Sequence, residues 1–234
     1  MYQTMAQAKI KLAIFDLDGT LLDTIEDLGR ACNFALKACG CPERKMEEYN
    51  RLVGRGIYNL FRSALPEDRR SEQMVMKMKS FFIPYYNEHK TDFTRPYAGI
   101  PEMLEKIERH GIALAVASNK YQEGTEALVK RFFGERKFTG ILGQRDGMPI
   151  KPDPEIVREI ERKYGQIRPD EVIYSGDSDV DMETGRNAGV VTAGVLWGFR
   201  SREELIAHHP DMLCSSPEEL AETVIGWGNN DNNI

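Results

Sequence analysis

Two acidic motifs each follow a short apolar run, and their carboxylates could hold a metal ion. The first is Asp16-Leu17-Asp18-Gly19-Thr20, directly after residues 10–15, and the second is Gly176-Asp177-Ser178-Asp179-Val180-Asp181, shortly after residues 172–174. A buried strand that ends in bare carboxylates carries a large cost unless the charge is compensated. Clustered carboxylate oxygens suit a hard cation such as Mg²⁺. We therefore predict that Asp177 binds a metal, while Asp179 is expected to cap the helix that follows.

Two weaker motifs supply donors for an anion. Ser118-Asn119-Lys120 follows the apolar run 112–117, and its hydroxyl and side-chain amide could donate to phosphoryl oxygens. Lys151 stands in Lys151-Pro152-Asp153-Pro154, where two prolines stiffen the loop and start the next helix. Singly, these are ordinary turn residues and an ordinary surface lysine.

The four motifs make sense together through their charges. Asp16, Asp18 and Asp177 would bring three negative charges to one pocket, and a phosphate monoester adds about two more at neutral pH. Mg²⁺ and Lys151 would offset much of this charge. The set therefore predicts a metal-dependent site for a phosphorylated small molecule.

Alternating strand and helix patterns must position these residues. Such alternation predicts βαβ units, an open parallel sheet and an α/β fold with a Rossmann-like arrangement, helices covering both faces. We expect strands at residues 10–15, 112–117, 172–174, 190–196 and 211–214, and helices at residues 101–109, 122–133, 154–164 and 179–188 and around Leu205 and Leu220.

Residues 24–90 interrupt this rhythm with helical patterns alone. We expect a first helix capped by Asp23 or Thr24 and ended by Gly40. A second apolar stripe is formed by Met74, Met78, Phe81 and Tyr85. The predicted organisation is a core domain of residues 1–22 and 95–234 with a helical domain of residues 23–94 inserted into it.

Bulk properties exclude several classes of protein. A net charge of −6 over 234 residues does not favour nucleic acid or an anionic membrane as partner. Neither a signal peptide nor an apolar run of membrane-spanning length is present, so we expect a cytoplasmic protein, a monomer or homodimer, with reduced cysteines. Residues 1–8 and 229–234 are expected to be a loose leader and a frayed tail. The GxGxxG, GxxxxGK[ST] and GxSxG motifs are absent.

The four motifs, in this order, resemble those of the haloacid dehalogenase superfamily, and the inserted helices resemble the C1-type cap of that family. Residues 16–24 and 118–120 are most similar to the phosphoglycolate phosphatase branch. The resemblance implies that Asp16 is the nucleophile and a magnesium ligand. It implies that Asp18 is the general acid and base, with its backbone carbonyl on the metal.

The resemblance also implies roles for the remaining motif residues. Ser118, helped by Asn119, would donate to a phosphoryl oxygen, and Lys151 would stabilise charge on the transferring group and on Asp16. Asp177 would be the other protein ligand of the metal, and Asp181 would orient a metal-bound water. Thr20 and Gly54 complete the predicted substrate-binding residues, together with Arg55, which could pair with a substrate carboxylate or could simply face solvent.

Four other functions fit parts of the pattern. Sugar phosphomutases and pyrophosphatases of the same superfamily share the nucleophile, the acid and the metal, although mutases usually have an apolar residue where this chain has Thr20. Phospho-acceptor regulatory domains also combine an acidic cluster, a hydroxyl and a lysine, but they are about half this length and lack a helical insertion. A catalytically inactive binding module would not require intact motifs.

Overall fold

A parallel sheet of six strands, together with the helices on its two faces, forms the larger part of the molecule. The computed structural model describes residues 8–134 and 136–228. The strand order is β5-β4-β1-β6-β7-β8, which places β1 in the middle of the sheet between β4 and β6. The strands are β1 (Leu12–Phe15), β4 (Ala113–Tyr121), β5 (Phe138–Gln144), β6 (Val172–Gly176), β7 (Val191–Val195) and β8 (Met212–Cys214).

The register brings the chemical motifs to one edge of this sheet. Phe15, the last residue of β1, lies opposite Val116 of β4 and Ser175 of β6. Asp16 follows β1 directly, and Asp177 follows β6, two residues beyond Ser175. Ser118 lies two residues beyond Val116, inside β4, which runs on to Tyr121 and so is longer than the expected strand of residues 112–117. The three residues lie near this edge because the strands are parallel and in this register. Asp16, Ser118 and Asp177 meet there.

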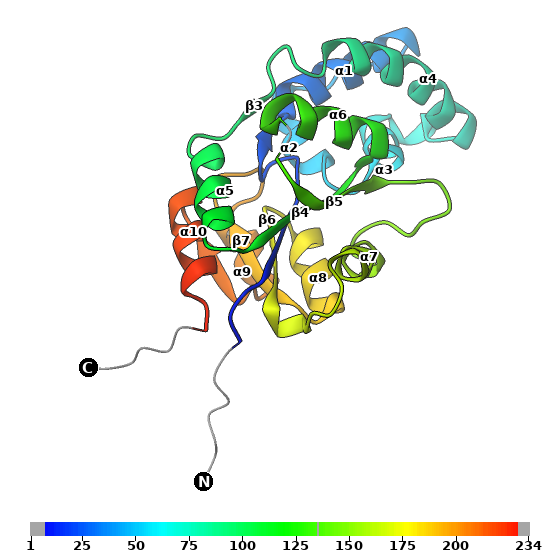
Figure 1. Ribbon diagram of the computed structural model, residues 1–234. Coiled ribbons are helices and arrows are strands. Elements are labelled where there is room, and N and C mark those ends of the chain that lie inside the picture. Colours follow the sequence, from blue (N-terminus) through cyan, green and yellow to red (C-terminus); the bar gives the residue numbers. More distant parts are fainter. Residues whose placement is uncertain (1–7, 135, 229–234) are drawn as a thin grey trace.

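Helices cover both faces of the sheet, so the predicted α/β fold is confirmed. On one face, α5 (Ile100–Arg109), α6 (Gln122–Phe133) and α10 (Pro217–Gly226) pack their apolar residues against the strands. On the other face lie α7 (Glu155–Tyr164) and α8 (Asp179–Ala188). Figure 1 shows α5 and α10 on one side of the strands and α7 and α8 on the other. The short helix α9 (Arg202–Ala207) follows β7.

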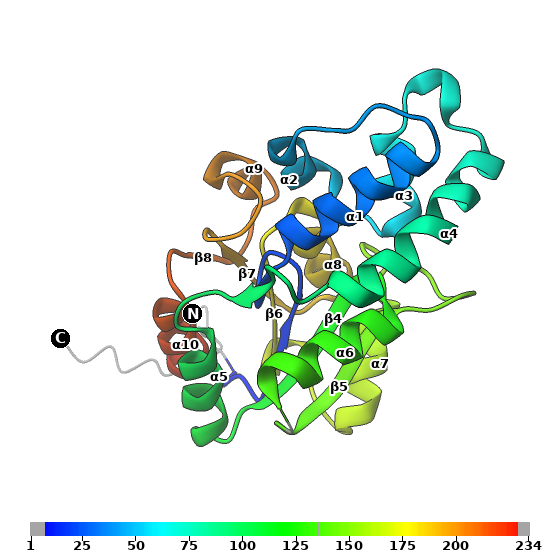
Figure 2. The same ribbon diagram turned by 90° about the horizontal axis from the view of Figure 1, so that it is seen from above.

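The segment between β1 and β4 is mostly helical and has its own apolar cluster. It contains α1 (Ile25–Ala38), α2 (Tyr49–Leu52), α3 (Ile57–Ala64) and α4 (Glu72–His89). Their buried side chains form a cluster separate from those on the sheet faces, and Figure 2 shows α1, α3 and α4 lying beside one another. Two strands, β2 (Leu22–Asp23) and β3 (Arg95–Pro96), pair antiparallel where the chain enters and leaves this segment. We call residues 24–94 the helical insertion.

Three features of the fold differ from the expectation. Strand β5 was missed because Gly140 and Gly143 interrupt its apolar run and its side chains are mostly half-buried at the sheet edge. The β2–β3 pair was expected to be only a linker. The predicted stripe on α4 was displaced, because the fully buried residues besides Met78 are Val75, Phe82 and Tyr86. This helix has apolar residues around most of its surface, so periodicity alone did not determine its buried face.

Other expectations concerned the start of the first helix, the cysteines and the two ends of the chain. Thr24 occupies the N-cap position of α1, and all four cysteines are buried free thiols. Among residues 8–134 and 136–228, the structure contains no helix with the length and apolar character needed to cross a bilayer. The expected tail lies outside the described residues, as does all but the last residue of the expected leader.

Candidate active site

Asp16 is held at the end of β1 by two donors on one oxygen. Its Oδ1 accepts a hydrogen bond from the backbone N–H of Leu17 at 2.7 Å and lies 3.0 Å from Lys151 Nζ. Both contacts use Oδ1, so Oδ2 is the oxygen left for another partner. The side chain is almost completely buried. These contacts fix the orientation of the carboxylate.

Lys151 connects three elements beneath the carboxylates. Its ammonium donates to Asp181 Oδ1 at 2.8 Å, to the Tyr174 hydroxyl at 2.9 Å and to the Ala117 carbonyl at 3.1 Å. Burial lowers the pKa of Lys151, but the charges of Asp16 and Asp181 outweigh this effect and hold the pKa well above its ordinary value. Lys151 is therefore a permanent, fixed cation.

Asp177 follows β6 and is enclosed by two loops. It accepts hydrogen bonds from the Thr20 hydroxyl at 3.2 Å and from the Phe199 backbone N–H at 2.7 Å. A Cβ atom at Gly19 would lie 2.4 Å from the Asp177 carboxylate, and one at Gly198 would lie 2.2 Å from the Asp177 Cβ atom. Only glycine allows both loops to approach this closely, so the two glycines shape the position of Asp177.

Asp181 lies in the first turn of α8 and anchors that turn. Its Oδ2 accepts from the backbone N–H and hydroxyl of Ser178, at 3.1 and 2.6 Å. Ser178 is the N-cap residue, so the expectation that Asp179 caps this helix was wrong. Asp179 is instead the first residue of the helix and forms an ion pair with Arg55 of the helical insertion.

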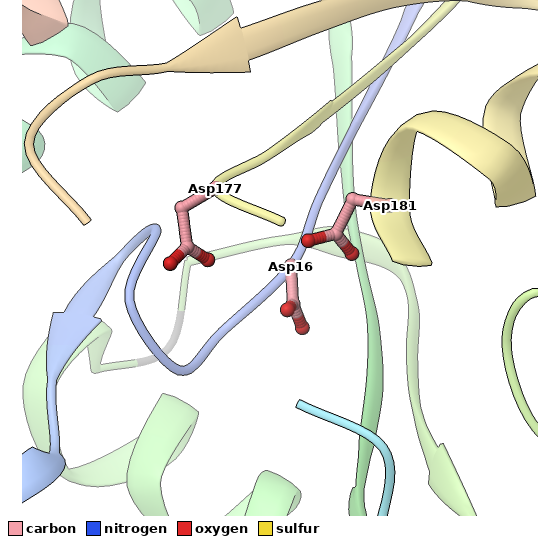
Figure 3. A group of neighbouring side chains, drawn as sticks. All are labelled: Asp16, Asp177 and Asp181. Atoms are coloured by element: carbon pink, nitrogen blue, oxygen red, sulfur yellow. The ribbon is translucent and has the colours of Figure 1, made fainter. Parts of the chain in front are cut away.

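Three of these carboxylates form a group that fits a divalent cation. One oxygen from each of Asp16, Asp177 and Asp181 lies within 4.8 Å of the others (Figure 3). Burial raises the pKa of Asp16 to about 8, an effect that Lys151 opposes and the charges of Asp181, Asp177 and Asp18 reinforce. Burial and the charge of Asp181 raise the pKa of Asp177 to about 7. The positive groups of the protein therefore offset only part of the negative charge of these carboxylates. This is expected for residues that hold a metal ion.

The raised pKa values predict how stability depends on pH without metal. Both carboxyls have an ordinary pKa of 3.8, so between about pH 4 and pH 8 the folded state binds more protons than the unfolded state. Their contribution to the free energy of unfolding is complete below pH 4 and is lost as pH rises through 7 and 8. We expect Mg²⁺ to raise the melting temperature much more at pH 8 than at pH 6. An Mg²⁺ effect of equal size at both pH values, or one unchanged in Asp177→Asn, would contradict this.

Asp18 has two partners, and one of them was not assigned a role from the sequence. The Thr24 hydroxyl donates to its Oδ1 at 2.8 Å, and Lys120 Nζ lies 2.9 Å from its Oδ2. Lys120 is buried and its ammonium also lies 4.8 Å from the centre of the Tyr86 ring. Asp18 is therefore positioned from both the helical insertion and the sheet.

The predicted donors of the Ser-Asn motif differ in their surroundings. Ser118 is buried, lines the same cavity as Asp16, and accepts a bond from the Lys120 backbone N–H at 3.3 Å, which leaves its proton free to donate. The Asn119 amide instead donates to the carbonyls of Gly54 and Lys151 and accepts from Lys151 N–H. In this arrangement Asn119 ties the insertion to the Lys151 loop.

The helical insertion is closed over the sheet edge. Arg200, which follows β7, donates to the backbone carbonyl of Val53 at 2.9 Å and to that of Asn50. Tyr121 donates to Asn87 of α4 at 2.7 Å. A cavity remains between the two parts, and its walls include Asp16, Asp18, Ser118 and Lys120 as well as Gly54. Arg55 is not part of its wall.

The tight packing around Asp177 gives a testable prediction. A methyl group at Gly198 must displace the loop, because it would lie 2.4 Å from the Gly19 carbonyl oxygen as well as 2.2 Å from Asp177. We expect Gly198→Ala to raise the Mg²⁺ concentration for half-maximal activity by about 10-fold or more, since supporting contacts set metal affinity. Gly226→Ala is the matched control, because a Cβ atom there meets no atom within 4 Å. Equal metal titrations for both variants would contradict the prediction.

The fold and the site together define an α/β protein with a buried acidic group at the strand ends beneath a helical insertion. The family profile described as haloacid dehalogenase-like hydrolase matches residues 13–195. The chain belongs to this family, as its motifs indicated.

The relatives identify the branch that it resembles. A phosphoglycolate phosphatase of Aquifex aeolicus is 31% identical over 213 residues, covering 91% of this chain and 96% of the relative. An N-acetylmuramic acid 6-phosphate phosphatase of Pseudomonas aeruginosa is 32% identical over 222 residues, covering 94% and 97%. A phosphoglycolate phosphatase candidate from Lactobacillus delbrueckii has a solved structure with a TM-score of 0.87 and 31% identity, covering 94% of this chain and 100% of that one. These findings confirm the predicted resemblance to phosphatases of this family.

Sequence reasoning missed several residues that support the site. Tyr174 appeared only as the last residue of an apolar run, and Gly198 and Phe199 carried no motif. Lys120 stood inside a motif, directly after two predicted donors, and this position was the only signal that could have drawn attention to it.

Proposed function

We propose that the protein is a magnesium-dependent phosphatase that hydrolyses small phosphate monoesters through a phosphorylated Asp16. The observation that carries this proposal is the pairing of two carboxylates in one cavity. Asp16 is fixed by Lys151 beside the acidic group, and Asp18 is fixed separately by Thr24 and Lys120. This arrangement supports Asp16 as the nucleophile and Asp18 as the general acid and base.

Asp16, Asp177 and Asp181 are the residues that would hold Mg²⁺ or its water ligands, with the Asp18 carbonyl as a further predicted ligand. When bound, the ion would neutralise carboxylate and phosphoryl charge. The donor set fits this role because its three carboxylates are buried with a single lysine among them.

The chain's own residues account for two displacement steps. A carboxylate oxygen of Asp16 attacks phosphorus while the bond from phosphorus to the leaving oxygen breaks, and Asp18 gives its proton to that oxygen. Asp18 then accepts a proton from water, whose oxygen attacks phosphorus and releases Asp16 and inorganic phosphate. Ser118 and Lys151 donate to the phosphoryl oxygens through both steps.

The closed insertion supports a water-excluding role around the ester. Its contacts through Arg200, Asn119 and Tyr121 hold it over the sheet edge, where it could limit the access of water to the bound ester. The names of the relatives make 2-phosphoglycolate the first substrate to test. Thr20, which contacts Asp177, and Gly54 and Arg55 remain predicted substrate-binding residues, although Arg55 pairs with Asp179 here.

The test is phosphate release from a panel of esters with and without Mg²⁺. The panel contains 2-phosphoglycolate, N-acetylmuramic acid 6-phosphate, β-glucose 1-phosphate, pyrophosphate and p-nitrophenyl phosphate. We expect metal-dependent release from at least the aryl ester and one metabolite. Isomerisation of the sugar phosphate without net phosphate release would favour a mutase. Stable labelling by acetyl phosphate without turnover would favour a phospho-acceptor.

A further inference from the structure

Lys120 is a buried cation in the wall of the cavity beside Asp18. It lies near the end of β4, and its side chain is only 3% exposed. An ammonium has three N–H donors. Asp18 takes one, and the face of Tyr86 lies 4.8 Å away. In the part of the chain that the structure describes, the Lys120 side chain has no other ion-pair or hydrogen-bond partner, so donor capacity remains for a ligand.

The rest of the wall offers almost nothing else to a charged group. The helical insertion contributes apolar side chains and glycines, namely Leu28, Val53, Gly54, Gly56, Ile57, Leu60 and Phe82. Among the described residues that line the cavity, Lys120 is the one cationic side chain. Arg55, the arginine nearest in sequence to this wall, is paired with Asp179 and is half-exposed.

The cavity also limits the size of the alcohol. The space open to the centre of a water molecule is about 40 Å³, whereas one water needs about 10–15 Å³ on that measure. A sugar would bring several hydroxyls against apolar walls, and each hydroxyl without a partner loses affinity. A short leaving group with one anionic group matches the wall better.

We propose that Lys120 is the specificity-determining residue of this enzyme, and that it selects a carboxylate on the leaving group. This inference rests on the proposed phosphatase function. An ammonium forms strong, charge-assisted hydrogen bonds with a carboxylate. Because Lys120 is 2.9 Å from Asp18, a carboxylate bound to it places an ester oxygen two bonds away beside that acid. The favoured substrates are phosphate esters of small 2-hydroxy acids.

The experiment compares 2-phosphoglycolate with 2-hydroxyethyl phosphate, in which a neutral alcohol group replaces the carboxylate. The measured quantity is the ratio of kcat/KM for the two esters, in the full-length enzyme with saturating Mg²⁺. We expect a ratio of about 30 to 150 for the wild type, because a buried charge contact contributes about two to three kcal/mol. Lys120→Met should bring the ratio close to 1, while Lys120→Arg should retain most of the preference.

Lys37→Met is the matched control, because Lys37 is exposed on α1 and is not part of the cavity wall. The ratio should be unchanged in that variant. Loss of the preference in Arg55→Met but not in Lys120→Met would overturn the inference. So would a Lys120→Met enzyme that is slower on both esters with an unchanged ratio, since Lys120 would then only position Asp18.

A test on the wild type covers the case in which Lys120→Met does not fold. Glycolate should inhibit hydrolysis of p-nitrophenyl phosphate at concentrations at least about tenfold lower than ethylene glycol. Equal inhibition by the two alcohols, or equal wild-type rates for the two esters, would overturn the inference and leave the phosphatase intact. Absence of Mg²⁺-dependent p-nitrophenyl phosphate hydrolysis would instead refute the proposed function, and the inference with it.

Discussion

Asp16→Asn is expected to abolish phosphate release from every ester, with kcat at least about 10⁴-fold lower than in the wild type. The amide has nearly the shape of the carboxylate and can still accept from the Leu17 N–H. It cannot form an acyl phosphate, so the chemistry is lost while the fold remains. The measurement is phosphate release under saturating Mg²⁺, with the melting temperature recorded alongside.

Asp68→Asn is the matched control for this prediction. Asp68 is exposed in the short 3₁₀ helix Glu67–Arg69 of the insertion, far along the chain from the acidic group. The same isosteric change there should leave kcat within about twofold, as is usual for surface positions. Residual activity above about one per cent of the wild type in pure Asp16→Asn would show that Asp16 is not the nucleophile.

Asp18→Asn is expected to separate the two steps according to the leaving group. Asp18 lies beside the nucleophile, held by Thr24 and Lys120, so its loss removes the proton donor without removing Asp16. An alkyl phosphate needs a proton on its leaving oxygen, so turnover should fall by about 10²- to 10⁴-fold. p-Nitrophenolate leaves unprotonated, so the first step should remain fast with that ester.

The distinguishing observation is a burst. In rapid mixing with p-nitrophenyl phosphate and Mg²⁺, Asp18→Asn should release about one equivalent of p-nitrophenolate per enzyme, followed by a slow phase limited by water attack. The alkyl ester should give no burst. Steady release without a burst, at the wild-type rate, would mean that Asp18 does not serve the second step. If Asp18→Asn slowed the first turnover of both esters by the same factor, Asp18 would have no role as the general acid.

The sequence predicted the site well where the chemistry depends on residues next to a strand. Asp16, Ser118 and Asp177 each follow or end an apolar run, and the alternation of strands and helices was enough to predict that parallel strands bring them together. Their meeting at the edge beside Phe15 follows from the central place of β1. Lys151 was predicted as a partner of Asp16, and the structure places it there.

Contacts made across the fold could not be predicted in this way. The approach of Gly198 to Asp177 joins loops after different strands, and neither residue type nor spacing reveals it. Lys120 contacts Asp18, although the two residues are 102 positions apart in the sequence. Arg55 was predicted to reach the substrate or solvent, whereas the closed insertion offers it Asp179. Each of these contacts depends on how the insertion sits on the sheet, and local sequence carries no record of that.

The central claim is that phosphate passes through Asp16, and chemical trapping tests it most directly. Wild-type enzyme is mixed with substrate and Mg²⁺, quenched in acid within milliseconds, and treated with borohydride, which reduces an acyl phosphate to the alcohol. Mass spectrometry of the peptide containing Asp16 should then show homoserine at that position, in a yield that rises with the burst in Asp18→Asn. Rapid turnover with Asp16 unmodified at every quench time, in the wild type and in Asp18→Asn alike, would contradict the account and indicate direct attack by water.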